Sequence, residues 1–132
     1  MRITLVSSCG LVLEAEGRTL LVDALNKQFR CYYGLPPGTF AQMLAGEPPY
    51  DALCGILCTH AHPDHYNALR TRQLQAASGA SVFVPQPQTP PQLALQFGPF
   101  CVEYHQFAHT PVPGWDAITH GVYFISAAGV SV

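Results

Sequence analysis

Residues 59–66 read THAHPDHY, and this short stretch decides how the whole chain is interpreted. It places His60, His62, Asp64 and His65 within six residues, although the 132-residue chain has only six histidines. Imidazole nitrogen binds zinc and iron well, and a carboxylate widens the range to manganese. Side chains two residues apart in an extended loop point the same way, so His60 and His62 can close on one ion. The stretch therefore predicts a His/carboxylate metal site, which is typical of catalytic rather than structural zinc.

The sequence on either side of this loop predicts a strand before it and a helix after it. Residues 53–58 (LCGILC) form a continuous apolar run of strand length, which is typical of a strand covered on both faces. Residues 67–78 predict a helix that Gly79 ends, with Leu69, Gln73, Leu74 and Ala77 toward the core. The metal ligands are therefore expected on a loop that leaves the end of a buried strand.

The rest of the chain predicts one mixed α/β domain over residues 1–132, with helices packed on sheet. Residues 2–6, 11–15 and 19–22 predict an antiparallel meander that ends at Asp23. The later elements expected are a helix from Thr39 to Gly46 with capping-box spacing, a strand at 81–84, a second capping-box helix over 90–97, strands at 100–108 and 119–126, and the beginning of one more at 130–132.

Composition excludes several classes of partner. Charged residues make up only 11 % of the chain and the net charge is -2, so there is no electrostatic case for binding nucleic acid or an anionic membrane. No apolar run approaches the length of a membrane span or of a signal-peptide core. The five cysteines form no CxxC pair, which fits reduced thiols in the cytoplasm, with Cys54 and Cys58 in the core. We therefore expect a small-molecule substrate.

The motif and its surroundings resemble the metallo-β-lactamase fold superfamily. THAHPDHY matches that family's H-x-H-x-D-H signature. Residues 5–24 (LVSSCGLVLEAEGRTLLVDA) look like its opening strands, and residues 48–60 (PPYDALCGILCTH) look like the buried strand that carries its ligands. The resemblance implies the family's four-layer αβ/βα sandwich, of which this chain would be the first half, with the second half largely missing.

The resemblance also implies the ligands of a first metal ion. His60 and His62 would bind it, and a third histidine would come from a later strand end. His109 suits that role because it ends a predicted strand and opens a loop. His120 is the alternative, although it is expected to begin the next strand rather than to follow a strand end. His105 lies mid-strand and is expected to be structural.

A second metal ion is implied beside the first. Asp64 and His65 would hold it, and Asp23 would orient a ligand or the metal-bound water. The cofactor expected is zinc, as one or two ions, with manganese or iron as other choices. Bound metal lowers the pKa of water from 15.7 to about 7, so metal-bound hydroxide would attack an ester, lactone or phosphodiester. Asp64 would be catalytic, holding the hydroxide and carrying its proton.

The chain departs from the family in its second half. The family adds a bridging aspartate in a Gly-Asp pair and a late histidine, but here no acidic residue follows Asp116, which lies in the wrong place. We therefore expect a C-terminally incomplete domain whose inner sheet exposes an apolar face that a second copy could cover. The alternative function is a non-catalytic metal-binding or interaction module left by truncation of such an enzyme.

Overall fold

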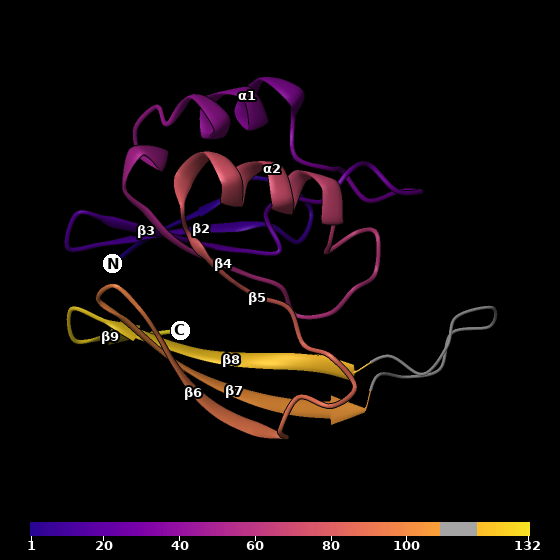
Figure 1. Cartoon of the computed structure of the whole chain (residues 1–132), viewed down its shortest axis with the longest axis vertical. Helices are drawn as coiled ribbons and strands as arrows, with labels where there is room; N and C mark the ends of the chain where they lie inside the picture. The colour runs from indigo at the N-terminus through magenta and orange to yellow at the C-terminus, as the bar shows by residue number, and fades with distance from the viewer. Residues whose placement is uncertain (109–118) are drawn as a thin grey trace.

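A computed structural model describes residues 1–108 and 119–132, and these residues form three layers (Figure 1). Within them, two α-helices cover one face of a five-stranded sheet, and a four-stranded sheet packs against its other face. This arrangement confirms the predicted mixed α/β class. Neither helix in the described part of the chain is long and apolar enough to cross a membrane.

The five-stranded sheet has the order β1-β2-β3-β4-β5 and carries the histidine loop at one end. The first three strands form the expected antiparallel meander, and the last two join it in parallel. Because β3 and β4 run parallel, both end at the same edge of the sheet, which brings Asp23 close to the loop after β4. The strands are Arg2–Leu5 (β1), Leu11–Ala15 (β2), Arg18–Val22 (β3), Leu53–Leu57 (β4) and Ser81–Phe83 (β5).

The four-stranded sheet is antiparallel, with the order β6-β7-β8-β9. Its central strands show the alternation of a sheet with one buried face: Phe100, Val102 and Tyr104 are buried, whereas Cys101 and Glu103 are exposed. This second sheet covers much of the inner face of the first. Ile3 and Leu5 of β1 remain exposed, so the apolar face expected to lie open there is only partly covered. The strands are Gln92–Phe97 (β6), Phe100–Ala108 (β7), Thr119–Ala127 (β8) and Val130–Ser131 (β9).

The helix expected over residues 90–97 is wrong, because this segment forms β6. Its side chains alternate between exposed and more buried positions, the period of a strand, and it pairs with β7 along its whole length. The capping-box spacing that suggested a helix belongs to a turn instead. The Thr89 hydroxyl accepts a hydrogen bond from the Gln86 backbone N–H, 2.8 Å away.

The two helices are those expected, although their details differ. Pro37–Ala45 (α1) begins without a side-chain cap, so the capping box expected from Thr39 does not form; proline at the first helical position begins the helix instead. Ala68–Ser78 (α2) is capped by Asn67, which accepts the backbone N–H of Arg70 at 3.0 Å. A short 3₁₀ turn, Tyr50–Ala52 (η1), leads into β4.

The buried side of α2 differs from the one expected. Leu74 and Thr71 are buried, but Leu69 is 52 % exposed. Gln73 and Ala77, also expected toward the core, are exposed as well. Leu69 and Leu74 are five residues apart, which places them on different faces of a helix that turns 3.6 residues per cycle. Only a narrow stripe of this largely polar helix therefore packs on the sheet.

Two apolar clusters hold the layers together. One lies between the helices and the first sheet, and the other lies between the two sheets. The helix-side cluster includes Leu21, Met43, Ile56 and Leu74. The inter-sheet cluster contains Leu13, Ala15, Leu20, Val22, Cys54, Leu57, Phe97, Phe100, Val102, Ile125 and Ala127.

Truncating the inter-sheet core should destabilise the fold. Phe100 is 0 % exposed, so Phe100→Ala removes a buried ring and leaves a cavity, at a cost of about 3–5 kcal/mol. Phe124→Ala is the matched control, because Phe124 is 56 % exposed and should cost about 1 kcal/mol or less. Urea denaturation of both variants measures the difference, and equal losses would contradict this packing.

Candidate metal centre

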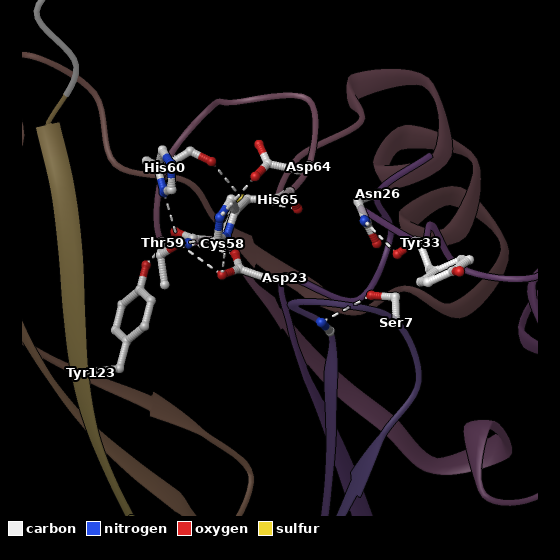
Figure 2. Close-up of polar contacts among 11 residues, drawn as sticks. Ser7, Asp23, Asn26, Tyr33, Cys58, Thr59, His60, Asp64, His65 and Tyr123 are labelled. Atoms are coloured by element: carbon white, nitrogen blue, oxygen red, sulfur yellow. Dashed lines mark hydrogen bonds and ion pairs between the residues drawn. The ribbon is translucent and has the colours of Figure 1, made fainter. Parts of the chain in front are cut away.

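The carboxylate of Asp23 ties the end of β3 to the histidine loop (Figure 2). Its Oδ1 accepts the backbone N–H of Thr59 at 2.8 Å, and its Oδ2 accepts the Thr59 hydroxyl at 2.7 Å. The same Oδ2 lies 2.8 Å from Nδ1 of His65. Asp23 is only 4 % exposed and has a φ of 51°, a left-handed conformation that aspartate tolerates better than most residues. One buried side chain thus fixes both the start of the loop and the ring of His65.

Histidine rings converge on His60, which is 2 % exposed. The ring centroid of His60 lies 4.6 Å from that of His62, 4.1 Å from that of His65 and 4.8 Å from that of His120. The first three rings come from the loop after β4, which turns back on itself because the backbone N–H of His65 donates to the carbonyl of His62 at 3.0 Å. The fourth comes from β8. Residues 60 apart in sequence therefore contribute to one cluster.

Two hydrogen bonds dock β8 on the end of β4. The Gly121 N–H donates to the carbonyl of Thr59 at 2.7 Å, and the Tyr123 hydroxyl donates to the carbonyl of Cys58 at 2.6 Å. No side chain fits at Gly121, because a Cβ there would lie 2.6 Å from a ring carbon of Tyr104. This close approach is what delivers the neighbouring histidine to the cluster.

Of the two candidates for a third histidine, His120 is the one that lies among the described residues. His120 is the second residue of β8, as expected of a strand start, and its ring nevertheless stacks on His60 at an interplanar angle of 28°. His109 lies outside the described residues, as does Asp116. His105 lies within β7, its ring edge-to-face with that of Phe124 at 5.5 Å.

A second group of potential ligands adjoins the cluster. Nε2 of His65 lies 3.6 Å from Oδ2 of Asp64. The Cys9 thiol joins them, since ligand atoms of Cys9, Asp64 and His65 all lie within 4.8 Å of one another. Sequence reasoning missed Cys9, because nothing in a lone cysteine between two strands indicates which part of the chain it will face. The neighbouring Gly10 is the one available signal of a close approach.

Burial and neighbouring charge set the protonation of the histidines. Burial, together with the nearby His65, His120 and His62, lowers the pKa of His60 to about 3. His60 is thus a neutral imidazole at physiological pH, which is the form that binds metal. Burial would also lower the pKa of His65, but its hydrogen bond to Asp23 and the charges of Asp23 and Asp64 outweigh that effect, and its pKa is raised.

Cys58 lies beside the loop but plays a different part. Its thiol donates to the carbonyl of His60 at 3.1 Å and to that of His65 at 3.6 Å. Burial, followed by the charge of Asp23, raises the pKa of this thiol. Cys58 therefore remains a protonated hydrogen-bond donor that supports the loop from inside, as expected for a core cysteine.

The donor set fits a divalent transition metal. Imidazole nitrogens, a carboxylate and a thiol are the groups that bind zinc in proteins. Tetrahedral coordination with bonds of about 2.0–2.3 Å places ligand atoms about 3.3–3.8 Å apart, and the His65–Asp64 pair at 3.6 Å already has that spacing. Asp23 contacts Nδ1 of His65, the ring nitrogen that does not face Asp64. Such carboxylate–histidine pairs orient metal-binding imidazoles.

Comparison with known proteins gives a fold relationship. No protein-family model and no curated protein matches the chain. Among solved structures it is similar to the crystal structure of a possible metal-dependent hydrolase from Veillonella parvula DSM 2008, with a TM-score of 0.51 and 14 % sequence identity. The match covers 96 % of this chain but 60 % of that one. At this identity the likeness establishes a shared fold alone.

The metal-free chain should lose stability as the pH falls, because of His60. In the unfolded chain this histidine takes up a proton near pH 6.5, whereas its pKa in the fold is about 3. Between these values the unfolded state binds more protons, so the free energy of unfolding decreases as the pH decreases. Replacing His60 with Gln should flatten this slope, as measured by urea denaturation at several pH values.

His65 contributes in a separate pH window. Its pKa in the fold is raised, so its stabilisation is fully present below about pH 6.5 and is lost as the pH rises through the folded-state pKa.

For the prediction on His60, His105→Gln controls for the loss of one imidazole outside the cluster. Identical slopes below pH 6.5 in the parent chain and in His60→Gln would show that His60 is not held neutral.

Asp23→Asn should weaken metal binding by about 10- to 100-fold, the usual effect of removing a ligand's supporting carboxylate. An asparagine amide has one oxygen and no charge, so it cannot accept the hydrogen bonds from Thr59 and His65 that the two carboxylate oxygens accept. The His65 ring then loses its fixed orientation. Zinc titration against a competing chelator measures the change. Asp51→Asn, an exposed aspartate in η1, is the control and should bind zinc like the parent chain.

Proposed function

We propose that this chain is part of a metal-dependent hydrolase of the metallo-β-lactamase superfamily. The observation that carries the proposal is the convergence of four histidine rings beside Asp64 at the end of a buried parallel strand. Three of the rings come from the loop after β4, and the fourth comes from β8, far away in the sequence. The H-x-H-x-D-H motif supports the same assignment. So does the fold neighbour from Veillonella parvula, itself described as a possible metal-dependent hydrolase.

Two metal positions are proposed. His60 and His62 would hold the first ion with a third histidine. The ring contact with His60 supports His120 for that place, and His109, outside the described residues, stays the other candidate. Asp64 and His65 would hold the second ion. Zinc is the proposed metal because imidazole dominates the donor set, with manganese or iron as alternatives. A divalent ion in such a site supplies Lewis-acid activation of water and polarisation of the scissile carbonyl or phosphoryl group.

The residues of the chain prepare the site for this chemistry. Neutral His60 offers a ligand nitrogen without competition from a proton at neutral pH. Asp23 holds Nδ1 of His65 and so turns Nε2 toward Asp64. Asp64 is the proposed catalytic group, because its carboxylate lies 3.6 Å from Nε2 of His65, where it would orient the attacking water and accept its proton.

An apolar pocket beside the cluster bears on the substrate. It has a volume of about 320 Å³, lies between the two sheets, and reaches Thr59 and His120. A pocket of this character favours a substrate with an apolar portion, such as an ester or lactone, over a phosphodiester. The other lining residues are Ile3, Leu11, Leu13, Val22, Gly121, Val122, Tyr123, Ile125 and Val132.

The state of the cysteines supports the proposed location. All five lie in described segments and are free thiols. Free thiols persist in reducing compartments, so a cytoplasmic location is part of this proposal.

The chain as purified should contain zinc, and it should hydrolyse members of a panel of lactones, carboxylic esters and phosphodiesters with zinc or manganese added. His62→Ala should lose metal and activity together, because it removes a ligand. Asp64→Asn should keep the first ion but slow hydrolysis by about 10²- to 10⁴-fold, the usual contribution of a general base. Elemental mass spectrometry and initial rates measure the two effects.

His105→Ala is the matched control for removal of a histidine from outside the cluster, and it should retain metal and rate. A folded chain that binds no metal would contradict the proposal. A chain that binds metal but hydrolyses nothing on the panel would favour the non-catalytic metal-binding module instead.

A further inference from the structure

The loop between β1 and β2 brings a sulfur ligand to the cluster. The geometry points to Cys9 as a thiolate ligand of the ion held by Asp64 and His65, so that this position binds metal through sulfur, oxygen and nitrogen together. This inference rests on the proposed function, because it concerns the second of the two metal positions. It adds a residue from outside the H-x-H-x-D-H motif and defines which metal the position prefers.

The backbone around Cys9 is fixed by its own hydrogen bonds. The Val6 N–H donates to the carbonyl of Gly10 at 2.8 Å, and the Gly10 N–H donates to the Ser7 hydroxyl at 2.9 Å. These bonds close a tight turn with Cys9 inside it. The thiol is therefore presented by a defined loop rather than by a freely moving chain.

Contacts with the rest of the fold press this turn against the site. A Cβ at Gly10 would lie 2.8 Å from Cα of Ala24 and 3.1 Å from the carbonyl oxygen of Asp23, so the turn packs on the segment that follows β3. On its other side, Ser8 exchanges two hydrogen bonds with Tyr33, at 3.0 Å and 2.7 Å. Both neighbours of Cys9 are thus anchored, and its thiol adjoins the ligand atoms of Asp64 and His65.

The ligand atoms are nearly at coordination distance. Sγ of Cys9, a carboxylate oxygen of Asp64 and a ring nitrogen of His65 lie within 4.8 Å of one another. Zinc with tetrahedral geometry needs ligand atoms about 3.3–3.8 Å apart, so side-chain movements of about 1 Å would bring these atoms to coordination distance. On binding, the sulfur donates an electron pair to the ion, the S–H bond breaks, and the proton passes to solvent.

The other cysteine near the loop does not compete for this role. The Cys58 thiol is engaged by the carbonyls of His60 and His65 from the core side, whereas Cys9 is half-buried and adjoins the ligand atoms. A thiolate is a soft ligand that selects zinc or iron over manganese and magnesium. The second position is therefore expected to discriminate against manganese because of Cys9.

Cobalt substitution tests the inference without relying on activity. The Co²⁺-loaded chain should show a near-ultraviolet sulfur-to-cobalt charge-transfer band, and Cys9→Ser should lose that band. Its zinc affinity should fall by at least the roughly 10-fold that loss of a ligand's supporting partner costs, with a smaller change for manganese. Cys101→Ser, at an exposed cysteine of β7, is the matched control and should keep both the band and the affinity.

A second measurement uses the unmodified chain and so does not depend on how Cys9→Ser folds. Zinc should protect Cys9 from alkylation, as shown by peptide mapping, while the exposed Cys31 reacts with and without zinc. Bound cobalt without a charge-transfer band, a band that persists in Cys9→Ser, or unprotected Cys9 in the zinc-loaded chain would overturn this inference alone. A folded chain that binds no metal would overturn the proposed function and this inference with it.

Discussion

The buried carboxylate of Asp23 is the junction on which the site depends. It accepts two hydrogen bonds from Thr59 and contacts Nδ1 of His65, so it joins the ends of two parallel strands and sets one imidazole in place. A buried carboxylate is costly unless its oxygens are paired, and here both oxygens are. The left-handed backbone of Asp23 is the strained conformation that permits this pairing. Fold stability and ligand geometry are therefore coupled at one residue.

The second sheet does more than cover the first. Its β8 strand is fastened to the end of β4 by the Gly121 and Tyr123 hydrogen bonds, and this carries His120 to His60. The same docking buries His60 and lowers its pKa, which keeps the imidazole neutral. Packing between layers thus keeps the imidazole of His60 neutral by excluding water from it. The proposed metal centre is built at the edge where all of these constraints meet.

Local patterns predicted most of the elements, and their failures have physical causes. The uninterrupted apolar run before the motif predicted a strand buried on both faces, and β4 is buried at every residue. A helix was expected where β6 forms, because a Thr-Pro-Pro-Gln sequence can either cap a helix or form a turn. Pairing with β7 selects the turn and the strand that follows it. In α2 the sequence offered two leucines, and the sheet accommodated only the face that carries Leu74.

The sequence by itself determined that His60, His62, Asp64 and His65 leave one strand end together, because side chains within a span of six residues cannot separate far whatever the rest of the chain does. Tertiary structure alone decided which distant side chains join them. Asp23 could be expected nearby from a resemblance, but the contact of its Oδ2 with His65 depends on the parallel pairing of β3 and β4. His120 and Cys9 reach the cluster through a docked strand and a tightly packed turn. Such long-range contacts leave no periodic trace in the residues that make them.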